Sequence, residues 1–150
     1  MAMSINHQFF FTQTPDMVWA YLTNADLMEL WLMKNDFQPI VGHEFTFTTK
    51  PKPALNFDGI FYCKVLEIVP FKRLSYSWKG GPGDGKITLD TLVVWRLEQK
   101  ATGTELFLEH TGFDAVENLA LHAGMTDGWI KNVQKIADRL NAAQHDTTNA

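Results

Sequence analysis

The feature that most constrains the fold lies near the end of the chain, in residues 126–143. Apolar side chains recur there in steps of four, three and four, which is the spacing of one face of an α-helix. They are Trp129, Val133, Ile136 and Leu140, with Ile130 and Ala137 widening the stripe. Because so wide an apolar stripe needs a partner surface, we expect this helix to lie across the rest of the domain.

The middle of the chain has a period of two, which is typical of β-strands with one buried face. Leu74, Tyr76 and Trp78 show this alternation clearly. Turn residues separate the alternating runs, above all in the glycine-rich segment 80–85 and in the tight hairpin at 101–103. We predict strands over 6–12, 43–49, 56–69, 74–78, 87–97 and 104–111.

Two short helices are expected between the first two strands. Thr14 is a suitable N-cap, and Pro15 suits the first helical position, where its missing N–H costs nothing. A second helix is expected to start at Asn24 or Asp26 and to end near Trp31. The segment 114–124 is expected to be irregular or partly helical before the final helix begins.

These elements predict an α+β domain of two layers, in which a curved antiparallel sheet of about six strands wraps around the long C-terminal helix. We expect a single domain over residues 1–150, with a disordered tail at about 144–150. A helix laid over a strongly curved sheet often encloses a cavity. Such a cavity is the first place to expect a small ligand.

The composition narrows the classes of partner. The net charge is −4 without a basic block, which argues against nucleic acid or an anionic membrane as the main partner. No apolar run approaches the roughly 20 residues that span a bilayer, and the N-terminus does not read as a signal peptide. The single cysteine, Cys63, fits a reducing compartment. We therefore expect a soluble, cytoplasmic protein.

Several short motifs keep a characteristic order along nearly the whole chain. They are Thr14-Pro15, Val18-Trp19, Leu30-Trp31, Gly42 with Phe45, Asp58-Gly59, Val65 to Pro70 (VLEIVP), Arg73-Leu74, Trp78, Gly103 to Leu106 (GTEL), His110, Gly112-Phe113 and Gly128-Trp129. In this order they resemble the START-like (SRPBCC, helix-grip) superfamily. Within it, the chain is similar to the AHSA-like group, which resembles the C-terminal domain of the activator of the 90-kDa heat-shock protein ATPase.

The resemblance implies a helix-grip fold with a hydrophobic pocket between the sheet and the final helix. It leaves the function open, because superfamily members include lipid carriers, hormone receptors, aromatase/cyclase enzymes and chaperone activators. The co-chaperones of the group also have a separate N-terminal domain. We expect no room for one in these 150 residues, which argues against heat-shock ATPase activation.

The sequence offers little for catalysis. It has five scattered histidines, none of them paired at a metal-ligand spacing, so we expect no metal site. His110 shares a predicted strand face with Leu106 and Leu108. The favoured interpretation is a hydrogen-bonded core histidine, and the alternative is a group that orients a ligand or acts as a general acid or base. The segment 80–85 is expected to be a flexible loop beside the cavity mouth.

The predicted site is a cavity lining made mostly of aromatic side chains. Its members are Trp31, Phe45, Phe61, Trp78, His110, Met125 and Trp129. Phe61 and Cys63 face the same side if their strand is regular, and a bulge would invert this assignment.

The predicted function is binding of a small hydrophobic or aromatic ligand, with no catalytic residue, metal or cofactor assigned. One alternative is a stress-response module that acts on a heat-shock chaperone. Another is a cyclase- or hydratase-type enzyme that uses the same cavity. Pairing of exposed sheet edges would also allow a homodimer.

Overall fold

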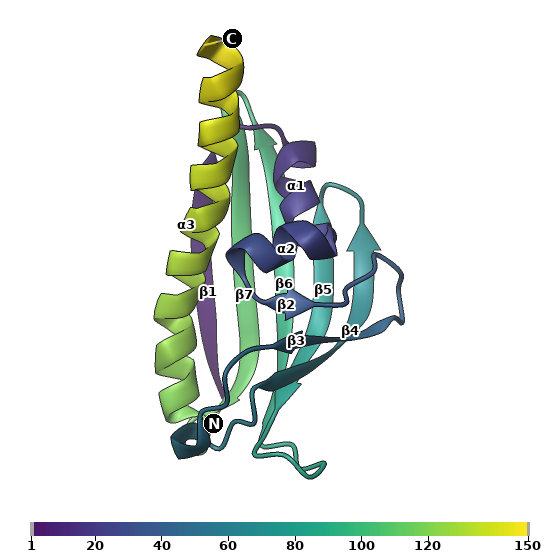
Figure 1. Cartoon of the computed structure of the whole chain (residues 1–150), viewed down its shortest axis with the longest axis vertical. Coiled ribbons are helices and arrows are strands. Elements are labelled where there is room, and N and C mark those ends of the chain that lie inside the picture. Colours follow the sequence, from purple (N-terminus) through teal and green to yellow (C-terminus); the bar gives the residue numbers. More distant parts are fainter. Residues whose placement is uncertain (1, 150) are drawn as a thin grey trace.

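The computed structural model describes residues 2–149, with side chains described as far as Ala143. Within these residues three α-helices lie on one face of one curved antiparallel sheet (Figure 1). In chain order the elements are β1 (Ala2–Phe11), α1 (Pro15–Thr23), α2 (Ala25–Trp31), β2 (Lys34–Asn35), β3 (Glu44–Thr48), the 3-10 turn η1 (Pro53–Leu55), β4 (Ile60–Val69), β5 (Arg73–Gly80), β6 (Leu89–Lys100), β7 (Gly103–Asp114) and α3 (Leu119–Asn149).

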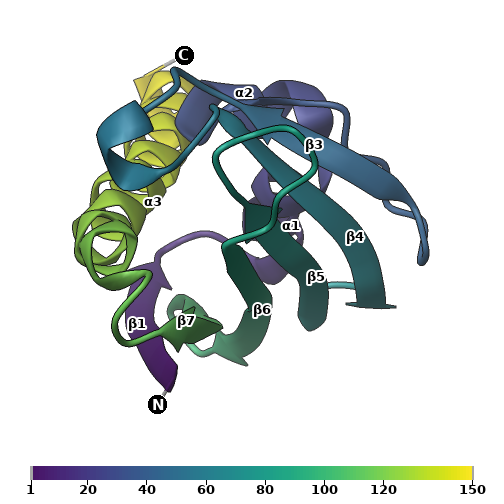
Figure 2. The same cartoon turned by 90° about the horizontal axis from the view of Figure 1, so that it is seen from below.

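The strands in the described part of the chain follow the order β1-β7-β6-β5-β4-β3-β2. Figure 2 looks along the sheet and shows it curving around the helices. The predicted α+β helix-grip fold, with two short helices after the first strand, is confirmed. About six strands were expected and seven are present in this region. The additional strand is β2, whose two residues, Lys34 and Asn35, pair with β3 and are too few to show an alternating pattern.

The alternation in the sequence correctly predicts which side chains of β5 and β6 face the core. Leu74, Tyr76 and Trp78 are buried in β5. In β4, Phe61 and Cys63 share the buried face, because the irregularity of this strand comes after them, between Val65 and Glu67.

A bulge in β7 brings two rings together that simple alternation would separate. His110 and Phe113 are three residues apart, so a regular strand would point them to opposite faces. The register with β1 instead steps from Thr111 to Phe113, and the skipped residue, Gly112, has a φ of 101°. His110 and Phe113 are both buried, with ring centroids 4.5 Å apart.

The two short helices begin where the capping residues predict. Thr14 occupies the N-cap position of α1, but its side chain makes no capping hydrogen bond. Asn24 does cap α2, since its Oδ1 accepts a hydrogen bond from the backbone N–H of Leu27 at 3.1 Å. Trp31 is buried at the end of α2, whereas Leu30 is exposed.

The final helix is longer than predicted. α3 begins at Leu119 rather than near residue 126. The chain turns within residues 115–118 because Asp114 Oδ1 accepts hydrogen bonds from the backbone N–H groups of Val116 and Glu117. Asn118 then holds this turn against the sheet, since its Nδ2 donates to the carbonyl oxygen of Thr88 at 2.9 Å.

The apolar stripe of α3 packs on the sheet as expected. Its four predicted members, Trp129, Val133, Ile136 and Leu140, are buried. The assignment of Ile130 to this stripe is wrong, because its side chain is 48% exposed. It follows Trp129 by one residue, which turns it about 100° around the helix.

Two histidines attach α3 to the edge strand β1. His7 Nε2 lies 2.9 Å from the carbonyl oxygen of Thr126, and His122 Nε2 lies 2.9 Å from that of Ser4. A carbonyl oxygen only accepts, so each imidazole Nε2 carries the proton and donates. These contacts fix the height of α3 along the sheet.

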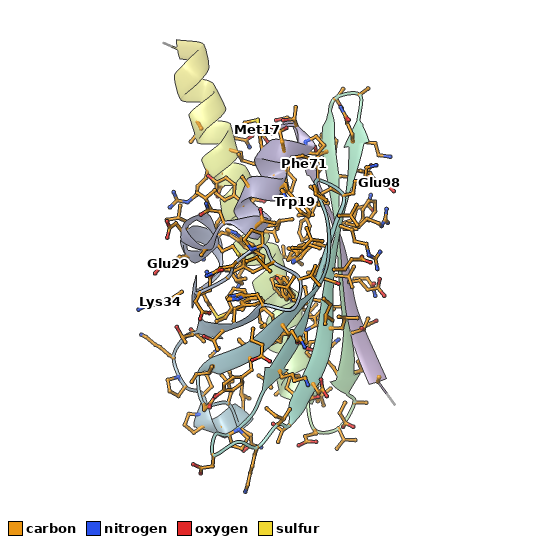
Figure 3. All side chains as sticks on the ribbon, turned by 90° about the vertical axis from the view of Figure 1, so that its right-hand side faces the viewer. Met17, Trp19, Glu29, Lys34, Phe71 and Glu98 are labelled. Atoms are coloured by element: carbon orange, nitrogen blue, oxygen red, sulfur yellow. The ribbon has the colours of Figure 1, made fainter. Side chains whose placement is uncertain are left out.

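An aromatic contact closes the end of the core beside α1. Trp19 packs edge-on against Phe71, with ring centroids 6.2 Å apart. Figure 3 shows these two side chains near Met17, and shows Glu98 on the outer side of the sheet. The outer, convex face of the sheet carries exposed charged residues. The apolar core lies on the concave face, which the helices cover.

The backbone of residues 144–149 belongs to α3, and their side chains lie outside the described part. The disorder predicted for about 144–150 stays a prediction. Within residues 2–149, no helix combines the length and the apolar character needed to cross a membrane.

Candidate functional site

A cavity of about 250 Å³ lies between α3 and the strands β4 and β5. The segment that contains η1 closes one end of it. Figures 1 and 2 both show this short turn beside the first turns of α3. The cavity is lined by Leu32, Met33, Thr49, Lys52, Leu55, Phe57, Phe61, Trp78, Ala120, Leu121, Gly124, Met125, Gly128, Trp129 and Asn132.

Helix α3 contributes two rows of residues with a spacing of four, which places each row along one side of the helix. The larger side chains are Leu121, Met125 and Trp129. The other row consists of smaller residues: Ala120, Gly124, Gly128 and Asn132. A Cβ atom added at Gly124 or Gly128 would meet no atom within 4 Å. The small row therefore leaves open the space that the larger side chains border.

Aromatic rings form the opposite wall. Phe61 and Trp78 have centroids 4.5 Å apart, and Phe57 stacks on Phe61 at the same distance. Trp129 reaches across from α3 to within 5.4 Å of the Trp78 ring. The period-two pattern of β4 and β5 positions Phe61 and Trp78, and the helical stripe positions Trp129. The wall therefore forms where the buried side chains of two strands contact the apolar stripe of α3.

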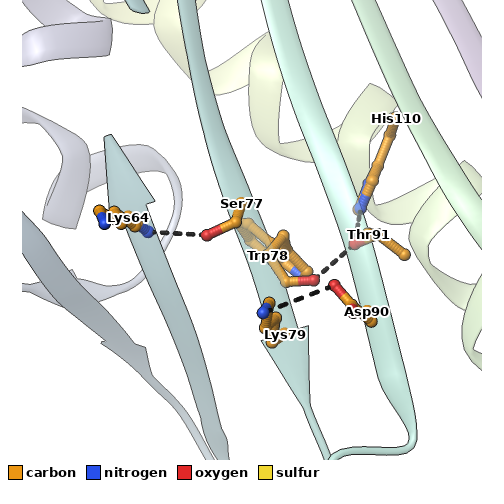
Figure 4. Close-up of polar contacts among 7 residues, drawn as sticks. All are labelled: Lys64, Ser77, Trp78, Lys79, Asp90, Thr91 and His110. Carbon is orange, nitrogen blue, oxygen red and sulfur yellow. Dashed lines mark hydrogen bonds and ion pairs between the residues drawn. The ribbon is translucent and has the colours of Figure 1, made fainter. Parts of the chain in front are cut away.

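A buried chain of hydrogen bonds runs behind this wall, and Figure 4 shows the part of it that joins His110, Thr91 and Trp78. Trp129 Nε1 donates to His110 Nδ1 at 3.1 Å. His110 Nε2 lies 2.8 Å from Thr91 Oγ1, which in turn donates to the backbone carbonyl oxygen of Trp78 at 2.6 Å. Since an indole N–H only donates, Nδ1 of His110 must accept, and the proton of the neutral ring sits on Nε2.

The surroundings hold His110 in this neutral form. Burial, with a smaller effect from the nearby His122, lowers the pKa of His110 to about 3. Each ring nitrogen already has a partner, one as acceptor and one as donor. His110 is therefore a fully hydrogen-bonded core histidine that fixes the position of Trp129.

Trp78 differs from Trp129 in one respect. Its side chain is 1% exposed, and its Nε1 is buried without a hydrogen-bond acceptor among the residues that the structure describes. A buried donor without a partner costs about 1–3 kcal/mol of stability. The unpaired donor thus belongs to a residue that borders the cavity.

The seven predicted site residues fall into three groups: four line the cavity, one lies directly behind it, and two lie elsewhere in the core. Phe61, Trp78, Met125 and Trp129 line the cavity together. His110 lies directly behind it, hydrogen-bonded to Trp129.

The other two predicted residues lie in the core and do not border this cavity. Trp31 donates from Nε1 to the carbonyl oxygen of Tyr21 at 2.8 Å and packs edge-on against Trp95. Phe45 packs against Phe37 and Tyr76. The glycine-rich segment 80–85 contributes no lining residue either.

Sequence reasoning missed the small-residue row of α3. Its signal was present as the spacing Ala120, Gly124, Gly128, Asn132. It was overlooked because the segment up to Gly124 was expected to be irregular. Leu55 was also missed, since it lies in a proline-rich break with no regular pattern, and Phe57 was missed although it lies in the predicted strand 56–69.

A larger open groove of about 1030 Å³ lies at the other end of the sheet, between the β4–β5 turn and the β6–β7 hairpin. Its charged side chains are exposed, and Glu98 there pairs with Arg96 and with Lys100. This groove lacks the buried aromatic wall of the smaller cavity, which is therefore the candidate site.

In the part of the chain that the structure describes, the other potentially reactive groups do not form a catalytic or metal site. Burial, with a smaller effect from Asp36, raises the pKa of the Cys63 thiol and keeps it protonated. Among the described residues, no group of three or more His, Cys, Asp or Glu side chains is arranged to hold a metal ion.

Comparison with known families and structures adds to this geometry. A family model described as activator of Hsp90 ATPase homolog 1-like protein matches residues 12–141, which include every residue of the cavity lining. The chain belongs to this family. The resemblance inferred from the sequence motifs is thereby confirmed. No curated protein matches the chain.

Solved structures of other proteins share this fold. Protein MLL2253 from Mesorhizobium loti is 31% identical, with a TM-score of 0.82 over 93% of this chain and 98% of that one. The Aha1 dimer from Colwellia psychrerythraea is 19% identical, with a TM-score of 0.71 over 91% and 94%. CalU16 from Micromonospora echinospora is 22% identical, with a TM-score of 0.70 over 93% and 74%. The last two likenesses concern the fold alone.

Proposed function

We propose that this protein binds a small hydrophobic or aromatic molecule in the cavity between α3 and the sheet. The observation that carries the proposal is the cavity itself, with Phe61, Trp78 and Trp129 on its walls and the small-residue row of α3 leaving it open. Concave sites with mostly apolar walls and a few polar groups are the usual form of small-molecule sites.

The size of the cavity limits the ligand. A cavity of about 150 Å³ lined by aliphatic and aromatic side chains holds one benzene molecule. The 250 Å³ observed here therefore suits a compact ligand of one or two rings. Met33 and Met125 border the cavity, and their unbranched side chains adapt readily to different shapes.

The chemistry of the walls supports binding over catalysis. Lys52 is the one ionisable side chain among the lining residues. General acid–base catalysis needs a group that can exchange a proton with the ligand near neutral pH. His110 lies behind the wall, and both of its nitrogens are occupied. A cyclase- or hydratase-type reaction has no acid–base pair in this arrangement.

The test is native mass spectrometry of protein purified from cells, in search of a retained small molecule. Gly128→Leu is the blocking variant, because its side chain would grow into the open space beside Trp129. Gly128→Ala is the matched control. We expect the native protein and Gly128→Ala to retain the molecule and folded Gly128→Leu to lose it. Equal retention by all three would place the molecule elsewhere and overturn the proposal.

A second candidate function is a chaperone-associated role in the stress response, which the description of the family favours. It predicts that the protein accelerates the ATPase of a heat-shock chaperone of the 90-kDa class. The measurement is steady-state ATP hydrolysis with and without the protein. An unchanged rate at saturating protein would end this candidate. It would leave the ligand-binding proposal intact.

The Colwellia relative was solved as a dimer. A homodimer of this chain and a cytoplasmic location remain proposals of the same kind. Light scattering over a range of concentrations tests the first, and cell fractionation tests the second.

A further inference from the structure

Among the residues that the structure describes, Trp78 Nε1 has no hydrogen-bond acceptor, whereas the neighbouring polar groups are paired. Trp129 Nε1 donates to His110, and Thr91 Oγ1 bonds to both His110 and the Trp78 carbonyl oxygen. Trp95 Nε1 donates to the hydroxyl of Tyr76 at 3.0 Å. Buried polar groups are nearly always paired, so an exception calls for a specific explanation.

The position of Trp78 points to that explanation. The ring borders the cavity and packs between Phe61 and Trp129, at centroid distances of 4.5 and 5.4 Å. None of these neighbouring rings offers a strong acceptor to an indole N–H. A ligand in the cavity that the ring borders is one source of a partner for Nε1.

The charge at the cavity adds a second constraint. Lys52 is the charged residue of the lining, and an ammonium group donates hydrogen bonds but cannot accept them. Lys52 and Trp78 Nε1 both seek electron-rich atoms. A cationic ligand would face the Lys52 charge and leave the Trp78 donor without a partner. A pure hydrocarbon would also leave that donor unpaired.

We propose that the cavity selects compact ring compounds that carry an oxygen acceptor, such as a ketone or phenolate, and that this oxygen accepts a hydrogen bond from Trp78 Nε1. This inference rests on the proposed ligand-binding function and names the chemical class of its ligand. Trp78 would act as the residue that determines specificity, while Phe61 and Trp129 supply apolar contact.

Three probes with one carbon skeleton test this selectivity: indane, indanone and aminoindane. Indane has no acceptor, indanone adds a carbonyl oxygen, and aminoindane is a cation at neutral pH. We expect indanone to bind at least about fivefold tighter than indane, because one added hydrogen bond contributes about 1 kcal/mol. Aminoindane should bind most weakly. Calorimetry or ligand-observed NMR gives the dissociation constants.

The indole N–H resonances report the contact directly in the native protein. On addition of indanone the Trp78 N–H resonance should move downfield, and on addition of indane it should not. Trp78→Phe keeps a ring and removes the donor, so it should bring the two affinities to within about twofold of each other. Trp19→Phe makes the same change in a tryptophan that does not line the cavity and should preserve the preference.

The outcomes separate this inference from the proposed function. Equal binding of indane and indanone, with the Trp78 N–H resonance unmoved, would overturn the acceptor requirement and leave ligand binding standing. Absence of binding by all three probes would overturn both. If Trp78→Phe does not fold, the downfield shift in the native protein decides the inference by itself.

Discussion

Nε1 of Trp129 donates a hydrogen bond to Nδ1 of His110 at 3.1 Å, and this contact joins the helix α3 to the strand β7 at the back of the cavity. It sets the tautomer of the neutral histidine as well as the position of the tryptophan. A protonated imidazole carries hydrogen on both nitrogens, so it could not accept from Trp129. The aromatic wall of the cavity therefore depends on a histidine that stays neutral.

The first prediction concerns pH. The pKa of His110 is about 3 in the folded protein, against an ordinary value of 6.5. Between these values the unfolded chain binds a proton that the folded protein excludes. The contribution of His110 to the free energy of unfolding should therefore be constant above about pH 7.5 and should fall as the pH drops below about 6.5. The contribution of His110 approaches about 1.4 kcal/mol per pH unit.

The comparison variant is His110→Gln, whose amide can accept and donate but does not titrate in this range. Urea unfolding of both proteins from pH 8 to pH 5 isolates the effect of His110, because all other titrating groups are shared. The native protein should lose stability relative to the variant as the pH falls. Parallel curves would contradict the buried neutral histidine.

The second prediction concerns Trp129 itself. Trp129→Ala should lower the free energy of unfolding by about 3–5 kcal/mol, the usual cost of removing a large buried side chain. Ile130→Ala is the control on the same turn of α3 and should change stability by less than about 0.5 kcal/mol, since Ile130 is exposed. A small loss in Trp129→Ala, combined with loss of ligand binding, would instead make Trp129 a lining residue with little structural role.

The third prediction concerns a glycine inside α3. Gly128→Ala should raise the free energy of unfolding by about 0.5–1 kcal/mol, because glycine in a helix interior loses more backbone entropy than alanine. The added Cβ meets no atom within 4 Å, so no steric cost opposes this gain. Thermal unfolding measures the effect. A lower melting temperature would mean that the space beside Gly128 is already filled.

The fourth prediction concerns a glycine in β7, where the same substitution should act in the opposite direction. Gly112 has a φ of 101°, and a Cβ there would lie 3.0 Å from the carbonyl oxygen of Asp90. Gly112→Ala should therefore cost about 1–3 kcal/mol. The chemical shifts of the His110 and Phe113 rings should also change, since the bulge holds both on one face. Unchanged stability would show that the bulge tolerates a side chain.

Much of the fold could be predicted because the relevant patterns are local. The burial of Leu74, Tyr76 and Trp78 follows from the alternation of a strand, and that of Trp129 and Val133 from the spacing of a helix. The start of α3 could not be predicted, because it depends on Asn118 bonding to Thr88, thirty residues away in the chain. A contact between residues so far apart in the chain cannot be predicted from a local sequence pattern.

The candidate site was predicted less completely than the fold. Trp31 and Phe45 were expected at the cavity because they are large and aromatic, but residue type does not say which other buried residue lies next to them. Trp31 meets Trp95 instead, and Phe45 meets Phe37. The small-residue row of α3 was missed because glycine in a sequence reads first as a break in a helix.

The sequence by itself determined most of the secondary structure, most of the inward positions on the strands and on α3, and the membership of a family. Those properties follow from side-chain periodicity and from motif order along the chain. Only the tertiary structure decided that Trp129 pairs with His110, that Gly112 turns Phe113 inward, and that the buried donor of Trp78 has no acceptor in the described part of the chain. Each of these depends on atoms from distant segments meeting at hydrogen-bond or van der Waals distance, which is set when the helix closes over the sheet.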